Sequence, residues 1–313
     1  MSTNITDETK NKINTDEAVT YGIRKTIFRF REYPFYYFTE SDIHASMVKD
    51  IVEGNSEKFY LPIRDTNLKL SLVHLEYPTN FKFSRAEALN EGNVETPDRI
   101  KQRGNFDLVV LKESMFSQIV DDTVKINMEN NGITNKELLL ISLLRSIISK
   151  DIDQNESYHN NLKLPIGELI DYAIEVKFFH FNNATQDMFE QVKIDNFKLE
   201  QSICEGAKIN PVNLIFCYYW NDKKARNDNK GSNDKWEKKI KAFRNNLLNG
   251  NIGIDNASLT PIPEKVLNIF IVVNVNQNAF KETPRPAYYY NDGTFNNHPD
   301  WVRLLTKGYE VNP

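Results

Sequence analysis

The sequence predicts an α/β protein with a mixed central sheet flanked by helices and with an inserted helical segment. Apolar residues recur at helical spacing in residues 40–53 and 187–200. Stretches rich in β-branched and aromatic residues lie around these helices, at residues 68–77, 106–111, 171–180, 212–220 and 266–273. Three of them, at 106–111, 212–220 and 266–273, are almost continuously apolar, which is typical of strands covered on both faces. Helices and strands in this alternation predict a layered fold.

The helix expected at residues 40–53 has a recognisable start. Thr39 is a favoured N-cap residue, and Thr39 with Asp42 resembles a capping box. Glu40 and His44 then lie one turn apart on one face of the helix. Two interpretations stay open for this pair. Either Glu40 complements the helix dipole beside a surface or half-buried His44, or this face takes part in a site.

One elaborated domain is expected at residues 19–283. Residues 1–18 are polar and lack an apolar period, which predicts a disordered or weakly ordered lead. The aromatic residues 27–38 are interrupted by Pro34 and are expected to be extended. An insertion at 113–165 contains a strongly apolar helix at 136–149. Residues 284–313 form an aromatic tail, with a turn signal within 288–295, that is expected to pack on the domain.

Composition and charge disfavour several classes of protein. The formal net charge of the 313 residues is −4, so any contact with nucleic acid must be local. Cys204 and Cys217 form no Cys-x-x-Cys pair and predict neither a disulfide framework nor a zinc module. An α/β hydrolase lacks support because no Gly-x-Ser-x-Gly motif is present. The polar N-terminus and the lack of a long apolar run predict a soluble, cytoplasmic protein.

Charged side chains occur in two of the apolar strands. Asp107 opens the strand at 106–111, where a buried carboxylate needs a partner, and either a metal ion or Arg103 would serve. Glu175 and Lys177 are two residues apart in the strand at 171–180, so their side chains point to the same face. An isolated Glu-x-Lys pair is usually a solvated sheet edge, but its combination with Asp107 favours a site.

Basic residues are concentrated in one segment. Between residues 222 and 244, nine Lys or Arg side chains accompany four acids. This segment is either a solvated helix face or an edge that contacts phosphate through Lys238, Lys241 and Arg244. Lys198, in the helix expected at 187–200, either forms an ordinary ion pair with Asp195 one turn earlier or contacts phosphate as well.

The order of these features resembles the PD-(D/E)XK nuclease superfamily over residues 35–220. A helix with Glu40 precedes a strand ending at Glu76, a strand opening with Asp107, a strand with Glu175 and Lys177, a helix and a further strand. No Pro precedes Asp107, as the literal pattern would require. The segments around residues 37–43, 76–79 and 103–107 are similar to an uncharacterised prokaryotic group within the superfamily.

The resemblance implies a restriction-endonuclease-like αβββαβ core and a metal-dependent nuclease, with DNA as the expected substrate. It implies that Asp107, Glu175 and the Val176 carbonyl hold Mg²⁺, for which Mn²⁺ substitutes. Lys177 would orient the attacking water or stabilise charge on the phosphate, and a nearby metal would lower its pKa. The further acid that the family places on the first helix would be Glu40, as an additional metal ligand. Glu76 competes for this role.

A different class of function is also compatible with the fold. In a catalytically inactive nucleic-acid-binding or protein-interaction module, Asp107, Glu175 and Lys177 would form only a buried salt-bridge cluster. For the nuclease, cutting both strands of a duplex would favour a homodimer, and an unidentified protein partner is compatible with it. No motif distinguishes DNA from RNA or single from double strands.

Overall fold

The computed structural model describes residues 15–53, 56–62, 69–89, 101–114, 169–180, 186–204, 209–221, 266–276 and 286–290. The helix expected at 136–149, the basic segment at 222–244 and most of the aromatic tail lie outside the described residues.

A mixed sheet forms the centre of the molecule. Its six strands lie in the order β3-β4-β5-β6-β7-β8, and they are β3 (Val73–Phe83), β4 (Gln102–Leu111), β5 (Ile170–His180), β6 (Asn210–Asn221), β7 (Leu267–Asn276) and β8 (Pro286–Tyr290). β3, β4 and β5 are antiparallel neighbours, β5, β6 and β7 run parallel, and β8 pairs antiparallel with β7. A separate sheet pairs β1 (Tyr60–Pro62) with β2 (Lys69–Ser71). The predicted α/β class with a mixed sheet is confirmed.

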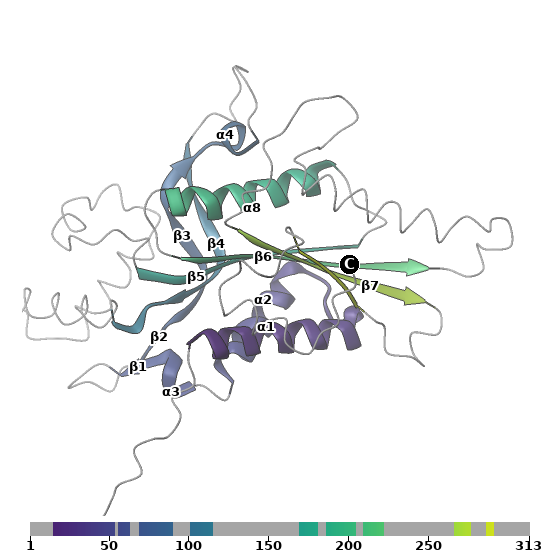
Figure 1. Ribbon diagram of the computed structural model, residues 1–313, viewed down its shortest axis with the longest axis horizontal. Coiled ribbons are helices and arrows are strands. Elements are labelled where there is room, and N and C mark those ends of the chain that lie inside the picture. Colours follow the sequence, from purple (N-terminus) through teal and green to yellow (C-terminus); the bar gives the residue numbers. More distant parts are fainter. Residues whose placement is uncertain are drawn as a thin grey trace, which may run out of the picture.

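Helices cover both faces of the large sheet. Figure 1 shows α8 (Gln186–Cys204) on one face and both α1 (Thr15–Glu32) and α2 (Glu40–Val52) on the other. Because β5 and β6 are parallel, the chain between them must cross over the sheet, and α8 is that crossover helix. The shorter described helices are η1 (Pro34–Tyr36), α3 (Ser56–Phe59) and α4 (Arg85–Leu89). In the described ranges, no helix is both long and apolar enough to cross a membrane.

The core lies between the α1–α2 pair and the sheet. Phe30 of α1 is fully buried, and its ring packs against Tyr37, Phe178 and Phe216 at centroid distances of 5.6, 6.0 and 5.1 Å. Aromatic pairs of this kind contribute about 0.5–1.5 kcal/mol beyond the area they bury. The cluster fixes α1 against β5 and β6, and α2 packs on α1 and β5.

α1 corrects two predictions. Residues 15–18 of the lead expected at 1–18 and residues 27–32 of the segment expected to be extended at 27–38 are helical, because a helix runs from Thr15 to Glu32. Its inward face carries Val19, Ile23, Ile27 and Phe30, which are all buried and are spaced by four, four and three residues. This period begins among polar residues and ends inside the aromatic segment, so each half looks irregular by itself. Packing on α2 and the sheet stabilises the helix.

β3 differs from the strand expected at 68–77. Leu72 forms a bend between β2 and β3, and β3 continues past Thr79 to Phe83. Glu76 therefore lies inside the strand and not at its end, with a φ of 52°, which is uncommon for a residue with a side chain. Pro78 is tolerated because β3 is an edge strand of the sheet.

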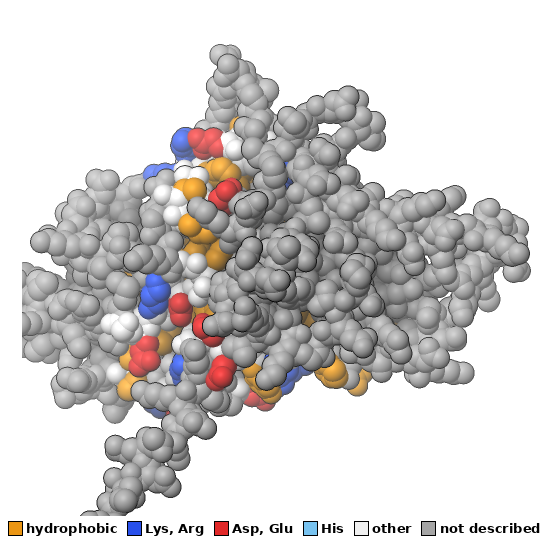
Figure 2. All heavy atoms as spheres, in the orientation of Figure 1, with side chains coloured by type: hydrophobic (Ala, Val, Ile, Leu, Met, Phe, Trp, Pro, Cys, Tyr) orange, Lys and Arg blue, Asp and Glu red, His pale blue; other side chains and the backbone are white. Residues whose placement is uncertain are grey.

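Charge is mixed on the described surface. Figure 2 shows acidic and basic side chains interspersed over the described part of the face that it presents. This distribution agrees with the small net charge of −4 and with local, not global, contacts to a charged partner.

Gly22 is expected to be required for the packing of α1 on α2. A Cβ at this position would meet Cγ1 of Ile51 and would lie 2.6 Å from its Cα and 2.7 Å from its backbone nitrogen. Gly22→Ala should therefore lower the free energy of unfolding by about 1–3 kcal/mol through overpacking, although Ala favours a helix. Urea unfolding would measure this. Ser41→Ala, at an exposed position of α2, is the control, and a Gly22→Ala variant as stable as the native protein would contradict the close approach.

Candidate active site

The end of the β4–β5 pairing contains the centre of the site. The two strands pair from Leu111 to Leu108, which lies opposite Ile174. Directly beyond this pair, Asp107 Oδ2 accepts a hydrogen bond of 2.7 Å from the backbone N–H of Val176. A side chain thus takes the role of the backbone ladder, and the buried carboxylate of Asp107 is held between the two strands.

Glu175 is held from α8. Lys198 Nζ lies 2.7 Å from Glu175 Oε1 and 3.0 Å from Asp195 Oδ1. The same ammonium group donates a hydrogen bond of 2.9 Å to the backbone carbonyl of Asn105. Lys198 therefore connects α8 with β4 and β5 through three oxygen atoms. It compensates a carboxylate, that of Glu175, which has no exposure to solvent.

Lys177 connects α8 with α2. Its Nζ lies 3.1 Å from Asp195 Oδ2 and 3.2 Å from Glu40 Oε1. The other carboxylate oxygen of Glu40 accepts a hydrogen bond of 3.3 Å from the backbone N–H of Phe178. Glu40 is the first residue of α2, so the N-terminal turn of this helix lies against β5. The structure thus brings Glu40 of α2 next to Lys177, the lysine of the Glu-x-Lys pair.

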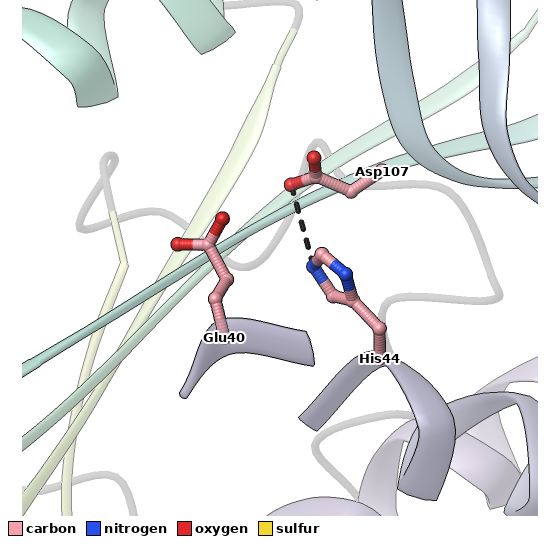
Figure 3. A group of neighbouring side chains, drawn as sticks. All are labelled: Glu40, His44 and Asp107. Carbon is pink, nitrogen blue, oxygen red and sulfur yellow. Dashed lines mark ion pairs between the residues drawn. The ribbon is translucent and has the colours of Figure 1, made fainter. Parts of the chain in front are cut away.

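α2 also brings a histidine to Asp107. The predicted capping box is present, with the Asp42 N–H donating to Thr39 Oγ1 at 3.3 Å and the Thr39 N–H donating to Asp42 Oδ2 at 2.8 Å. Figure 3 shows Glu40 and His44 pointing from α2 toward Asp107. His44 Nε2 lies 3.7 Å from Asp107 Oδ2, and one ligand atom from each of the three side chains lies within 4.8 Å of the others.

The carboxylates at the site differ in acidity. Burial raises the pKa of Asp107, but the neighbouring histidine, the two lysines and the strand N–H lower it by more, to about 2. Burial raises the pKa of Glu175 well above its ordinary value, against the opposing effect of Lys198. The pKa of Glu40 is also raised, chiefly by burial. Asp107 is thus the carboxylate that is most readily ionised of these three.

Both lysines are held as cations. Burial lowers the pKa of each, but the surrounding carboxylates raise it by more, so that the pKa of Lys177 and that of Lys198 lie above the ordinary value. For Lys177 the largest of these opposing effects come from Asp195, Asp107 and Glu40. The lowered pKa predicted for Lys177 applies to the protein with a metal bound. The positive charge of the metal would then oppose the effect of these carboxylates on the lysine pKa.

Full ionisation would leave the site with excess negative charge. The charge cluster, as we call it, comprises Glu40, Asp107, Glu175, Asp195, Lys177 and Lys198. Two ammonium groups against four carboxylates give 2 − 4 = −2. All but Glu40 and Lys177 are buried. Uncompensated buried charge is costly. One divalent cation would balance the net charge of −2 on the cluster.

Buried polar atoms without partners occur beside Glu175. Within the described part of the chain, neither Glu175 Oε2 nor the side-chain amide of Asn213 has a hydrogen-bond partner. Asn213 lies opposite Glu175 in the β5–β6 register, so both side chains emerge on the same face of the sheet. Both are fully buried. Such atoms are rare in proteins, and their proximity indicates a place for a polar ligand.

The other predicted site residues lie apart from this centre or outside the description. Glu76 is exposed and accepts a hydrogen bond of 3.1 Å from Asn105 Nδ2, and the metal-capable group of the described residues contains Glu40 and not Glu76. Lys198, for which a phosphate contact stays a prediction, is a buried member of the charge cluster and pairs with Glu175. Lys238, Lys241, Arg244 and the side chain of Arg103 lie outside the described residues.

Sequence reasoning missed or left open three residues at the site. Asp195 was expected only to pair with Lys198, but it contacts both lysines of the charge cluster. His44 carried a signal, because it follows Glu40 by one helical turn. Asn213 also carried one, since it interrupts an apolar run in a strand whose residues 211–216 are buried.

Comparison of the chain with protein-family models found no match. Comparisons with curated proteins and with solved structures found no significant similarity either. A functional proposal therefore depends on the geometry and chemistry of this chain's own residues.

Proposed function

We propose that this protein is a metal-dependent nuclease that hydrolyses phosphodiester bonds, with DNA as the expected substrate. The observation that carries the proposal is the meeting of Asp107, Glu175 and Lys177 where the β4–β5 pairing ends. In this proposal α2, β3, β4, β5, α8 and β6 correspond to the αβββαβ core of restriction-endonuclease-like proteins. The antiparallel β3–β4–β5 order and the α8 crossover to parallel β6 support that correspondence.

The residues present fit a divalent cation. Carboxylate oxygens of Asp107, Glu175 and Glu40 are hard ligands of the kind that Mg²⁺ takes, and the Val176 carbonyl would be the backbone ligand. The excess charge of the cluster and the unpartnered Glu175 Oε2 support such an ion. When bound, Mg²⁺ or Mn²⁺ would supply an activated water and compensation for charge that develops on the phosphate.

Lys177 acts as a cation in this proposal. Its carboxylate neighbours raise its pKa, which favours the protonated ammonium form. Glu40 and Asp195 hold its Nζ from α2 and α8. A positioned ammonium group stabilises negative charge on a phosphoryl oxygen most where that charge is greatest, in the transition state.

Lys198 and Asp195 position the groups that would contact substrate or metal. Lys198 holds Glu175, and Asp195 holds both lysines. Contacts to the remainder of a nucleic acid would be local, because charge is mixed over the described face (Figure 2). The basic segment at 222–244 stays a prediction for such contacts, as do a homodimer and a protein partner.

A non-catalytic nucleic-acid-binding or interaction module is a second candidate. It is favoured by the pairing within the charge cluster, where Lys177 contacts Glu40 and Asp195 while Lys198 contacts Glu175 and Asp195. In such a module these ion pairs would serve stability, and one carboxylate would stay protonated in place of metal binding. Binding of a divalent cation therefore distinguishes the two candidates.

The test is cleavage of circular single-stranded DNA, circular double-stranded DNA and RNA, each with Mg²⁺ or Mn²⁺. We expect the native chain to cleave at least one substrate, and Lys177→Met to cleave it at least about 100-fold more slowly because a transition-state charge partner is lost. Lys49→Met, which removes an exposed lysine of α2, should cleave like the native chain. A native chain that neither binds metal nor cleaves would contradict the nuclease and leave the interaction module.

A further inference from the structure

We infer that Glu40, His44 and Asp107 form a binding position for a first-row transition-metal ion, with His44 Nε2 as a nitrogen ligand. This position shares Asp107 and Glu40 with the oxygen-only position proposed above, and it differs because the His44 imidazole takes the place of Glu175 and the Val176 carbonyl. The inference rests on the proposed function for the role of the ion, since both carboxylates belong to both positions. Binding itself can be measured without any nuclease activity.

Local structure explains why the three side chains meet. The capping box fixes the start of α2, and the four-residue spacing then places Glu40 and His44 on one face of the helix. Asp107 faces them from β4, with Oδ2 oriented by the Val176 N–H at 2.7 Å (Figure 3). The second oxygen of Glu40 is oriented by the Phe178 N–H at 3.3 Å. Backbone donors therefore orient both carboxylates, as outer-shell groups do at metal sites.

The spacing of the ligand atoms suits a metal ion. One atom from each side chain lies within 4.8 Å of the other two. Ligands at about 2.1 Å from an octahedral ion are about 3.0 Å apart when adjacent and about 4.2 Å apart when opposite. The 4.8 Å limit on the observed separations of the Glu40, His44 and Asp107 ligand atoms is close to the larger of these values.

His44 supplies an independent observation. Its side chain is 8% exposed, and Nε2 has no hydrogen-bond partner within the described part of the chain. The distance of 3.7 Å to Asp107 Oδ2 is too long for a hydrogen bond. A buried polar atom in this state is costly, and coordination to a metal would remove the cost. The burial also corrects the open interpretation of His44 as a surface or half-buried residue.

The donor set selects the kind of ion. Carboxylates and water suit Mg²⁺, whereas an imidazole nitrogen favours transition metals. The affinity of such a site for divalent ions increases from Mn²⁺ toward Cu²⁺. Two carboxylates with one imidazole should therefore bind Mn²⁺ more tightly than Mg²⁺. Mn²⁺ is also the ion whose unpaired electrons report a bound nitrogen directly.

The experiment is pulsed electron paramagnetic resonance of the full chain with Mn²⁺, combined with calorimetric titration of Mn²⁺ and Mg²⁺. We expect a ¹⁴N coupling from one imidazole in the native chain and its loss in His44→Gln. That variant should bind Mn²⁺ at least about tenfold more weakly, because even outer-shell changes at metal sites cost this much, and its Mg²⁺ affinity should change less. Two variants should retain the coupling: His74→Gln, another histidine with an unpartnered Nε2, and Glu175→Gln, outside the group.

The outcomes separate the two proposals. A native chain without nitrogen coupling overturns the His44 site even if His44→Gln fails to fold, and retention of the coupling in a folded His44→Gln variant overturns it as well. Cleavage without nitrogen coupling would leave the nuclease standing and remove the inference. Nitrogen coupling that is lost in His44→Gln, in a chain that cleaves no substrate, would support the metal site and contradict the nuclease.

Discussion

Asp107→Asn is expected to reduce cleavage at least about 1000-fold while the protein stays folded. An Asn side chain can still accept the hydrogen bond from the Val176 N–H through its amide oxygen, but it lacks the charge that a divalent cation requires. The substitution also removes one charge from a buried cluster with an excess of carboxylates. Because the neighbouring groups lower the pKa of Asp107, its ionised form is favoured in the folded state, so the metal-free variant should have a melting temperature somewhat below that of the native chain.

A metal titration separates this expectation from simple damage to the fold. Mn²⁺ should raise the melting temperature of the native chain, because a ligand that binds the folded state stabilises it, and this increase should be absent in Asp107→Asn. Glu53→Gln makes the same acid-to-amide change at an exposed residue that pairs with Lys25 and should behave like the native chain. Cleavage by Asp107→Asn above about a tenth of the native rate would show that Asp107 is not a metal ligand.

Asp50→Ala is expected to cause a large loss of stability at the α1–α2 contact. The Asp50 carboxylate is fully buried and accepts hydrogen bonds from Thr26 Oγ1 at 3.0 Å and from Arg29 Nη2 at 2.8 Å. Removal of one partner from a buried ion pair costs about 3–5 kcal/mol. Because the Arg29 side chain is partly exposed and can gain water, we expect a loss near the lower end, about 3 kcal/mol.

Urea unfolding of single and double variants would measure this loss. Asp50→Ala and Arg29→Met should each destabilise the protein, and the double variant should lose less than the sum, because the two residues are coupled. Glu53→Gln, which changes the exposed Glu53–Lys25 pair at the C-cap of α2, is the control and should change stability little. A loss below about 1 kcal/mol in Asp50→Ala would show that the buried pair contributes little to the α1–α2 contact.

The Glu-x-Lys strand and the strand that opens with Asp107 could be predicted from the sequence. A strand has a period of two, so the common face of Glu175 and Lys177 follows from their spacing alone. The continuous apolar run after Asp107 likewise predicts a covered strand, and residues 106–111 are buried in β4. The capping box of α2 was predictable for the same reason, since it depends on residues three apart.

Other features could not be predicted because they depend on distant partners. α1 is helical although its aromatic end favours extended structure, since its buried face packs on α2 and the sheet. Glu76 lies within β3 because that strand continues along β4 beyond Pro78. Lys198 could equally have faced solvent, and its burial follows from the placement of α8 over β4 and β5.

The sequence by itself determined the α/β class, most of the order of strands and helices, and the candidate site residues Asp107, Glu175 and Lys177. These features depend on periodicity over a few neighbouring residues. Tertiary structure alone decided which charges meet. Asp107 and Val176 are 69 residues apart, and Glu40 and Lys177 are 137 apart. Contacts over such separations depend on strand register and helix docking, so the charge cluster, the place of His44 and the burial of Asn213 appear only in the folded chain.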